Sequence, residues 1–290
     1  MQPPTASAPS LYDDPGIYDI LMTPGTAAEL NVLQRIEKQL GCLRRRGTVW
    51  LEPACGTGRF LRLLASRGRR VIGFDRNAGQ LAYARARLRN RGLLRRVRLY
   101  QAEMTAFDSQ LRPASVDFAF NPVNSLRHLL TDDAMLSHFE QMARVLRPGG
   151  LYTVGISLRD DVQTTPEEDV WVAARGRCRV TQLVTYLPPE GQGARARRET
   201  VISHLMVERP GRTDHHDARY ELRTYRVREW ARLLARSSLR RLAVLDARGR
   251  PFQAGPSEPR SHQPAATAGP ASSELTHVPP YQLEVLTPRA

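Results

Sequence analysis

The sequence has almost no lysine. Lys38 is the only one, whereas arginine occurs throughout the chain and brings the formal net charge to +14. A phosphate-binding loop of the form G-x-x-x-x-G-K-[ST] is therefore excluded. Because the arginines are spread over every expected element, the excess indicates a compositional bias of the whole sequence, and isolated charge runs are usually solvated faces. A polyanion-binding surface stays open as the less favoured alternative.

Cysteine and long apolar runs are also scarce. Cys42, Cys55 and Cys178 are far apart and show no C-x-x-C spacing, which predicts neither a disulfide framework nor a metal site. The pair His215-His216 is expected in a charged turn without partner ligands, so no metal is predicted. No basic segment followed by an apolar core opens the chain, and no run approaches the ~20 residues of a membrane span. We therefore expect a cytoplasmic protein without a signal peptide.

One stretch, residues 49–61, joins an apolar strand to an amphipathic helix that begins near Arg59. Between them, Gly56 and Gly58 allow a sharp turn and a close approach of a ligand to the backbone. A strand, a glycine turn and a helix in this order usually bind a nucleotide-like ligand at the carboxyl edge of a parallel sheet.

The acid before this turn helps to identify the ligand. A dinucleotide fingerprint requires a third glycine, but Leu61 stands at that position. Glu52 would repel a pyrophosphate and attract a cation. The pattern acidic-x-x-x-Gly-x-Gly thus favours a cationic amino acid attached to a nucleoside and argues against a nicotinamide oxidoreductase.

These residues resemble the first motif of the class I S-adenosylmethionine-dependent methyltransferases. The resemblance implies a doubly wound α/β fold with a mostly parallel, seven-stranded sheet. It also implies that the glycine turn faces the methionyl part of S-adenosylmethionine. The residues expected there are Glu52, Ala54, Cys55, Gly56, Thr57 and Gly58.

Further acids follow the next two expected strands. Asp75 ends the strand 71–75, where an α/β nucleotide site commonly places a carboxylate on the ribose hydroxyls, and Arg76 adjoins it. Asn77 is the expected cap of the following helix. The resemblance implies that Glu103 accepts from the adenine amino group and that Met104 packs on the ring, although Asp is commoner than Glu at this position.

The strand 116–121 ends at Asn121, at the edge expected to carry Glu52 and Asp75. Asn121-Pro122 lacks the second proline and the aromatic residue of the amino-methylating nucleic-acid enzymes, so that match is rejected. The segment Asn124-Ser125-x-x-His128-Leu129 is similar to a loop of small-molecule N-methyltransferases of the glycine and sarcosine type. That resemblance implies a loop that borders cofactor and acceptor. A histidine that only bonds the backbone is an equally weighted alternative for His128.

The chain is expected to form four parts. Residues 1–25 are an N-terminal segment whose start, 1–10, is Pro/Ala/Ser-rich and expected to be disordered, and whose Tyr18 closes over the cofactor as a lid or packs as a staple. Residues 26–157 form the cofactor-binding core. Residues 158–226, rich in β-branched and aromatic residues, form an inserted antiparallel β-cap over the acceptor. Residues 227–290 complete the sheet and include a Pro/Ala-rich loop, 251–280.

The predicted activity is direct methyl transfer from S-adenosylmethionine to a small molecule, most readily to an amine nitrogen. His128 and His204 are the candidate bases, and the acceptor-side candidates are Asn124, Trp171 and Tyr186. The alternatives are a small-molecule O-methyltransferase, an RNA or DNA methyltransferase that uses the arginines, and a binding module without catalysis. The sequence leaves the oligomeric state open.

Overall fold

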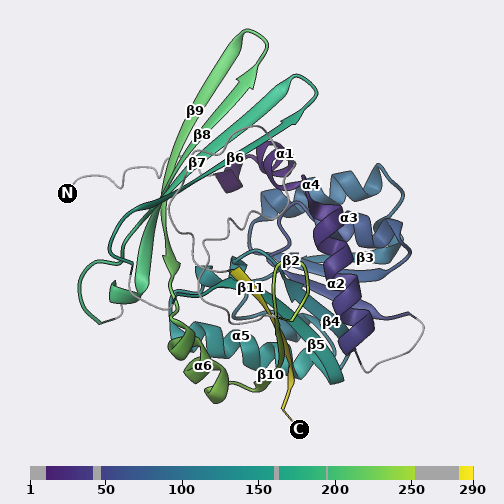
Figure 1. Cartoon of the computed structure of the whole chain (residues 1–290). Helices are drawn as coiled ribbons and strands as arrows, with labels where there is room; N and C mark the ends of the chain where they lie inside the picture. Colours follow the sequence, from purple (N-terminus) through teal and green to yellow (C-terminus); the bar gives the residue numbers. More distant parts are fainter. Residues whose placement is uncertain (1–10, 42–46, 160–162, 194, 252–280, 290) are drawn as a thin grey trace, which may run out of the picture.

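A seven-stranded sheet forms the centre of the molecule (Figure 1). The computed structural model describes residues 11–41, 47–159, 163–193, 195–251 and 281–289, so the predicted disordered start and residues 252–280 lie outside the described part. In spatial order the strands are β10 (Leu239–Leu245), β11 (Tyr281–Pro288), β5 (Leu146–Ser157), β4 (Val116–Asn121), β1 (Val49–Pro53), β2 (Arg70–Asp75) and β3 (Val97–Gln101).

Parallel pairing places the ends of the central strands at one edge. β1 pairs with β2 and β4, β2 pairs with β3, and β4 pairs with β5, all in parallel, whereas β11 is antiparallel to both of its neighbours. The carboxyl ends of β1, β2, β3 and β4 therefore meet at one edge. This architecture confirms the predicted fold.

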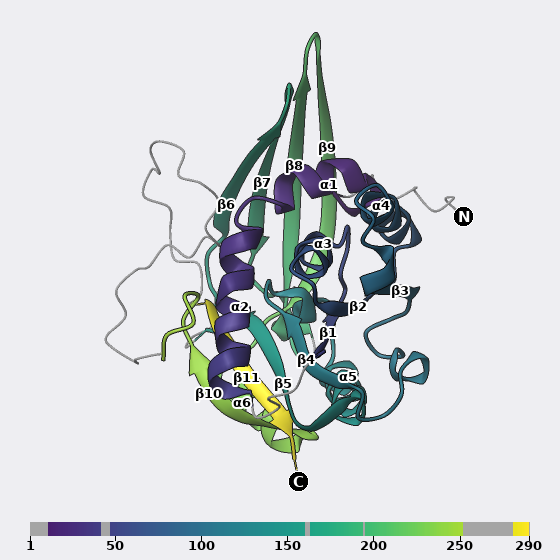
Figure 2. The ribbon, with the colours of Figure 1, turned by 90° about the vertical axis from the view of Figure 1, so that its right-hand side faces the viewer.

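Helices cover both faces of this sheet (Figure 2). One hydrophobic cluster packs α2 (Thr26–Leu40), α3 (Arg59–Ser66) and α4 (Ala78–Arg89) against one face. Another packs α5 (Asp132–Val145) and α6 (Val227–Arg236) against the other, with Phe139 and Trp230 fully buried. Such apolar burial contributes about 1.5–3 kcal/mol for each large side chain. Among the described residues, no helix has the length and apolar character of a membrane span.

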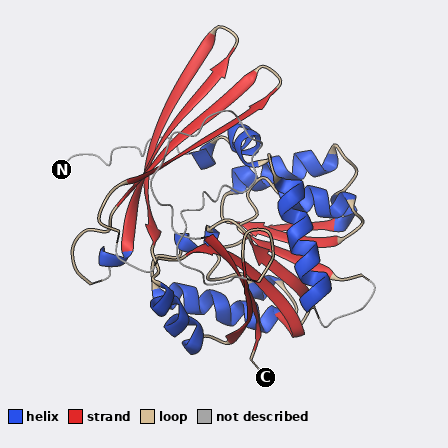
Figure 3. Ribbon diagram, viewed as in Figure 1, coloured by secondary structure: helices blue, strands red, loops and turns tan. Residues whose placement is uncertain are grey.

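A second, four-stranded antiparallel sheet, here called the cap sheet, lies in the chain between β5 and α6 (Figure 3). Its strands are β6 (Glu167–Arg175), β7 (Cys178–Leu187), β8 (Arg198–Arg209) and β9 (Arg212–Arg223). The prediction of a charged turn at His215-His216 was wrong, because both residues lie within β9 and the turn is at Gly211. Alternation of polar and β-branched residues was too weak in 212–219 to reveal this half of the strand.

The N-terminal helix α1 (Pro15–Met22) packs on the cap sheet. Its Ile17 and Leu21 share a buried cluster with Val180, Leu205 and Val207 of the cap sheet, and this cluster contains no described residue of the seven-stranded sheet. Asp14 begins the helix by accepting hydrogen bonds from the N–H groups of residues 16 and 17. Helix α1 is thus the apolar partner of strands that come much later in the chain.

Candidate functional site

The turn between β1 and α3 is built from left-handed residues. Ala54, Gly56 and Gly58 have φ angles of 50°, 52° and 69°. A Cβ added to Gly56 would lie only 3.1 Å from Cε1 of Tyr18, so glycine lets the α1 tyrosine approach the turn. Cys55 and Thr57, on either side of Gly56, are buried. Burial raises the pKa of the Cys55 thiol, which therefore stays protonated and packs as an apolar group.

Asp75, at the end of β2, holds this turn. Its Oδ2 accepts a hydrogen bond from the N–H of Gly56 at 2.8 Å, and its Oδ1 accepts from the N–H of Asn77 at 2.8 Å. Burial raises the pKa of Asp75, and these backbone hydrogen bonds partly offset the increase. Since a carboxylate has about four acceptor positions, the side chain can still accept from a ligand hydroxyl.

Glu52, on β1, is a buried carboxyl group with an unsatisfied oxygen. It is 5% exposed, and its Oε2 has no hydrogen-bond partner among the described residues. Burial raises its pKa well above the usual value, although Arg59 opposes the shift. Arg59 is itself paired in a bidentate manner with Glu29, at 3.0 and 2.8 Å. The site therefore retains one buried carboxyl group that a cation could stabilise.

Four ring side chains gather beside the turn, and we call them the ring group: Tyr12, Tyr18, His128 and Tyr220. The ring centroids of Tyr12 and Tyr18 are 5.7 Å apart, and those of His128 and Tyr220 are 5.8 Å apart and stacked. The Tyr12 hydroxyl oxygen lies 3.3 Å from Nε2 of His128. Burial, then the charges of Arg76 and Arg127, lower the pKa of His128 to about 4, so this imidazole is neutral at pH 7.

Strand register brings Tyr186 to the same side as Tyr220. Both pair across Val201 of β8, which lies between their strands, and residues paired in this way share one face of a sheet. Trp171 lies on this inner face as well, but it packs against the α1 cluster. Sequence reasoning proposed Tyr18, His128 and Tyr186. It missed Tyr12 and Tyr220, although Tyr12 stands in the same N-terminal segment as Tyr18.

His204 does not join this group. It lies on the outer face of the cap sheet, where its ring nitrogens contact Asp217 at 2.6 Å and His215 at 3.1 Å. Its neighbours Ser203 and Leu205 are buried, whereas the His204 side chain is 42% exposed. Because side chains alternate along a strand, His204 points away from the ring group and drops out as a candidate base.

The expected adenine side follows β3. Glu103 is exposed, Met104 is partly buried against the core, and Arg76 is exposed after β2. The backbone of Met104 is fixed by α5, because its carbonyl oxygen lies 2.8 Å from Nδ1 of His138, a fully buried residue of that helix. His138 is a residue that sequence reasoning missed.

Two of the predicted site residues, Asn121 and Asn124, form hydrogen bonds within the protein. Asn121 donates to the carbonyl of Pro53 at 2.7 Å and accepts from the hydroxyl of Tyr152 at 2.6 Å. Asn124 donates to Oγ of Ser157 at 3.0 Å and accepts from its N–H at 2.8 Å. The amides of both residues thus position loops at the sheet edge.

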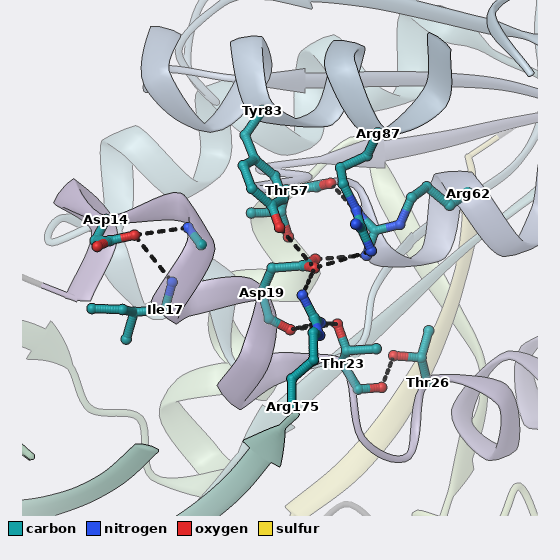
Figure 4. A network of polar contacts seen from close by, with 11 residues as sticks. Asp14, Ile17, Asp19, Thr23, Thr26, Thr57, Arg62, Tyr83, Arg87 and Arg175 are labelled. Atoms are coloured by element: carbon teal, nitrogen blue, oxygen red, sulfur yellow. Dashed lines mark hydrogen bonds and ion pairs between the residues drawn. The ribbon is translucent and has the colours of Figure 1, made fainter. Parts of the chain in front are cut away.

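Asp19 joins α1 to three other elements (Figure 4). This carboxylate is fully buried, with Arg62 of α3 at 2.6 Å, Arg175 of β6 at 2.9 Å and the hydroxyl of Tyr83 of α4 donating at 3.3 Å. Arg62 also donates to the carbonyl of Thr57 at 2.6 Å. Burial alone would raise the pKa of Asp19, but Arg62 and then Arg175 lower it overall.

Comparison with known proteins gives a match to the family model described as "Methyltransferase domain", over residues 51–150. YqeM of Bacillus subtilis (strain 168), which is named as a methyltransferase, is 30% identical over 101 residues, covering 35% of this chain and 39% of its own length. The chain thus spans about two-fifths of this curated relative. The predicted methyltransferase domain is confirmed over the matched residues.

Solved structures resemble nearly the whole chain. An S-adenosylmethionine-dependent methyltransferase from Clostridium acetobutylicum ATCC 824 has a TM-score of 0.66 at 14% identity, covering 95% of this chain and 97% of its own. The amino pentose methyltransferase CalS10 from Micromonospora echinaspora gives 0.63 at 18%, covering 98% and 99%. The sugar N-methyltransferase KedS8 from Streptoalloteichus sp ATCC 53650 gives 0.65 at 16%, covering 98% and 97%. At these identities the likeness concerns the fold.

The buried His138 predicts acid-sensitive stability. Burial lowers its pKa to about 4 in the folded protein, against 6.5 when exposed. The unfolded chain therefore binds more protons between these values, and the free energy of unfolding falls as the pH decreases from about 6.5 to 4, by about 3 kcal/mol for this residue.

Urea unfolding of wild type and His138→Asn at several pH values measures this effect. The variant is expected to be less stable near pH 7, with a smaller loss toward pH 4. Parallel curves for wild type and His138→Asn would contradict the assignment.

Proposed function

We propose that this chain transfers the methyl group of S-adenosylmethionine to an amine nitrogen of a small molecule. The observation that carries the proposal is the buried, unpartnered oxygen of Glu52 beside a left-handed glycine turn. A cationic amino-acid group placed there supplies the missing partner. When bound, the sulfonium of the cofactor is an already activated methyl donor.

The residues at the sheet edge fit the other parts of this cofactor. Asp75 has acceptor positions left for ribose hydroxyls after its two backbone bonds. Glu103 and Met104 follow β3, where the adenine is expected to lie. Cys55, Thr57 and Gly58 shape the turn, whereas Asn121 supports it from behind through the carbonyl of Pro53. The contribution of these residues is binding and alignment of the reacting atoms.

The ring group supplies the acceptor side. A neutral amine needs its lone pair free at the moment of attack, and His128, whose pKa is lowered to about 4, is a neutral imidazole that can accept an N–H hydrogen bond and orient it. Tyr12 and Tyr220 contact His128 with aromatic surface, and Tyr18 packs against Tyr12. Two relatives named for amino pentose and sugar N-methylation support a small amine as acceptor.

Transfer of labelled methyl from S-adenosylmethionine tests the proposal. Pools of small amines, amino sugars among them, are compared with small alcohols, total RNA and DNA. Label in the amine pool is the expected result. Label in alcohols or in nucleic acid would show that the acceptor is not a small amine. If the folded protein transferred label to none of the pools, the proposal would be overturned.

Glu52→Gln tests the cofactor site. We expect about tenfold weaker binding of S-adenosylmethionine, because the variant keeps the shape of the site and loses its charge. A cationic ligand also lowers the raised pKa of Glu52, so binding releases a proton and wild-type affinity should increase with pH.

Titration calorimetry between pH 5.5 and 8 measures both effects, with the exposed Glu140→Gln as control. Glu52→Gln is expected to flatten the pH dependence. An unchanged affinity would remove Glu52 from the site.

His128→Asn tests the acceptor side separately. The variant should lower kcat about a hundredfold while cofactor affinity stays within about twofold, because His128 orients the acceptor. His204→Asn is the matched control, since this histidine lies on the outer face of the cap sheet. Equal kcat values for His128→Asn and wild type would show that the ring group only packs.

A further inference from the structure

Several contacts attach the cap sheet to the rest of the protein, among them ion pairs made by Arg127 and by Arg175. At its base, Arg127 of the loop after β4 pairs with Glu199 and donates to the carbonyl of Arg223 at 2.9 Å. Near the turn of the β6–β7 hairpin, Arg175 pairs with Asp19 of α1 at 2.9 Å and also donates to the Asp19 carbonyl at 3.0 Å. The hairpin end is therefore tied to α1.

The same helix reaches the glycine turn by two routes. Tyr18 lies against Gly56, and Asp19 binds Arg62, whose other nitrogen donates to the carbonyl of Thr57. Asp19 thus binds both the guanidinium of Arg62, on α3 directly after the turn, and the guanidinium of Arg175, at the end of β6 (Figure 4). If α1 moved away from the turn, the pair of Asp19 with Arg62 would break. The hairpin would move with α1 unless the pair of Asp19 with Arg175 broke as well.

The chemistry of Asp19 makes this a stiff connection. The carboxylate is 0% exposed, and the Arg62 side chain is 6% exposed. A buried charge that loses its partner is strongly destabilised, so the Arg62 pair breaks only at a high free-energy cost. Arg175, whose side chain is 39% exposed, adds a second ion pair to the same carboxylate, and Arg87 lies at 3.9 Å. Ile17 and Leu21 of α1 lie in one buried cluster with Ala173 of β6 and Val180 of β7, so α1 and the hairpin share one body of packing.

We propose that Asp19 is a positioning residue that couples cofactor binding at the glycine turn to placement of the β6–β7 hairpin. The inference rests on the proposed function. A cofactor that holds Tyr18 and the turn together fixes the position of α1. Because Arg175 ties the hairpin to Asp19 of α1, the position of the hairpin is then fixed as well. The sheet that carries Tyr186 and Tyr220 is then in place before the acceptor enters.

Hydrogen exchange of the full chain, with and without S-adenosylhomocysteine, tests the coupling. In wild type the ligand is expected to slow exchange about fivefold in three peptides, 54–66 (turn and α3), 15–22 (α1) and 167–187 (hairpin). In Arg175→Gln the first two should remain protected, whereas protection of the hairpin should fall below about twofold.

Arg179→Gln is the matched control. Arg179 is on the neighbouring strand of the same hairpin and pairs with Glu208 at 3.6 Å, away from Asp19. It should keep the wild-type response. If Arg175 had only a structural role, its substitution would change hydrogen exchange equally with and without ligand. The ligand-dependent difference in exchange is therefore the decisive readout.

The outcomes separate the two proposals. No ligand protection of the turn peptide in wild type overturns the proposed function and, with it, the coupling. The coupling alone is overturned if the ligand protects the turn peptide but not the hairpin peptide in wild type. It is also overturned if the ligand still protects the hairpin peptide in Arg175→Gln. Asp19→Asn, which retains size and loses charge, should protect only the turn peptide; hairpin protection in this variant would also overturn the coupling.

Discussion

The hydrogen bond from the N–H of Gly56 to the Asp75 carboxylate is the contact on which the site depends, because it fixes the turn after β1 to the end of β2. It forms only since the two strands are parallel neighbours and end at the same edge. Tight packing underneath supports it: a Cβ on Gly73 would lie 2.5 Å from Leu61 and 3.0 Å from Cys55. The left-handed turn, the buried Glu52 and the approach of Tyr18 all follow from this anchored geometry.

Local sequence patterns predicted the central fold well. The glycine turn, Asp75 as a strand-end acid and the antiparallel insertion could be read because each depends on residues close together in the chain. What could not be read depends on contacts between distant segments. Tyr220 joins His128 only through the register of the cap sheet, and the face on which His204 lies is likewise set by that register. Asn121 has the right position, but Tyr152 and Pro53 use its amide.

A few arginines act as internal connectors. Arg62, Arg127 and Arg223 are nearly buried, and each joins elements that are far apart in the chain through a carboxylate or a carbonyl. A planar guanidinium suits this task because it can bind two acceptors at once. The high positive charge is therefore not by itself a measure of surface available to a polyanion. The buried pairs also explain how a sheet outside the main core is held at a defined position.

The packing of α1 has a consequence for how such enzymes could diversify. The helix is encoded before the cofactor-binding core, yet its Ile17 and Leu21 fill the apolar inner surface of strands encoded after it. An acceptor sheet exchanged between homologous genes as one contiguous block would arrive without the helix that covers it. Productive recombination would need two crossovers that carry both segments together, so new acceptor specificities should arise more readily by point substitution on the sheet than by exchange of the block.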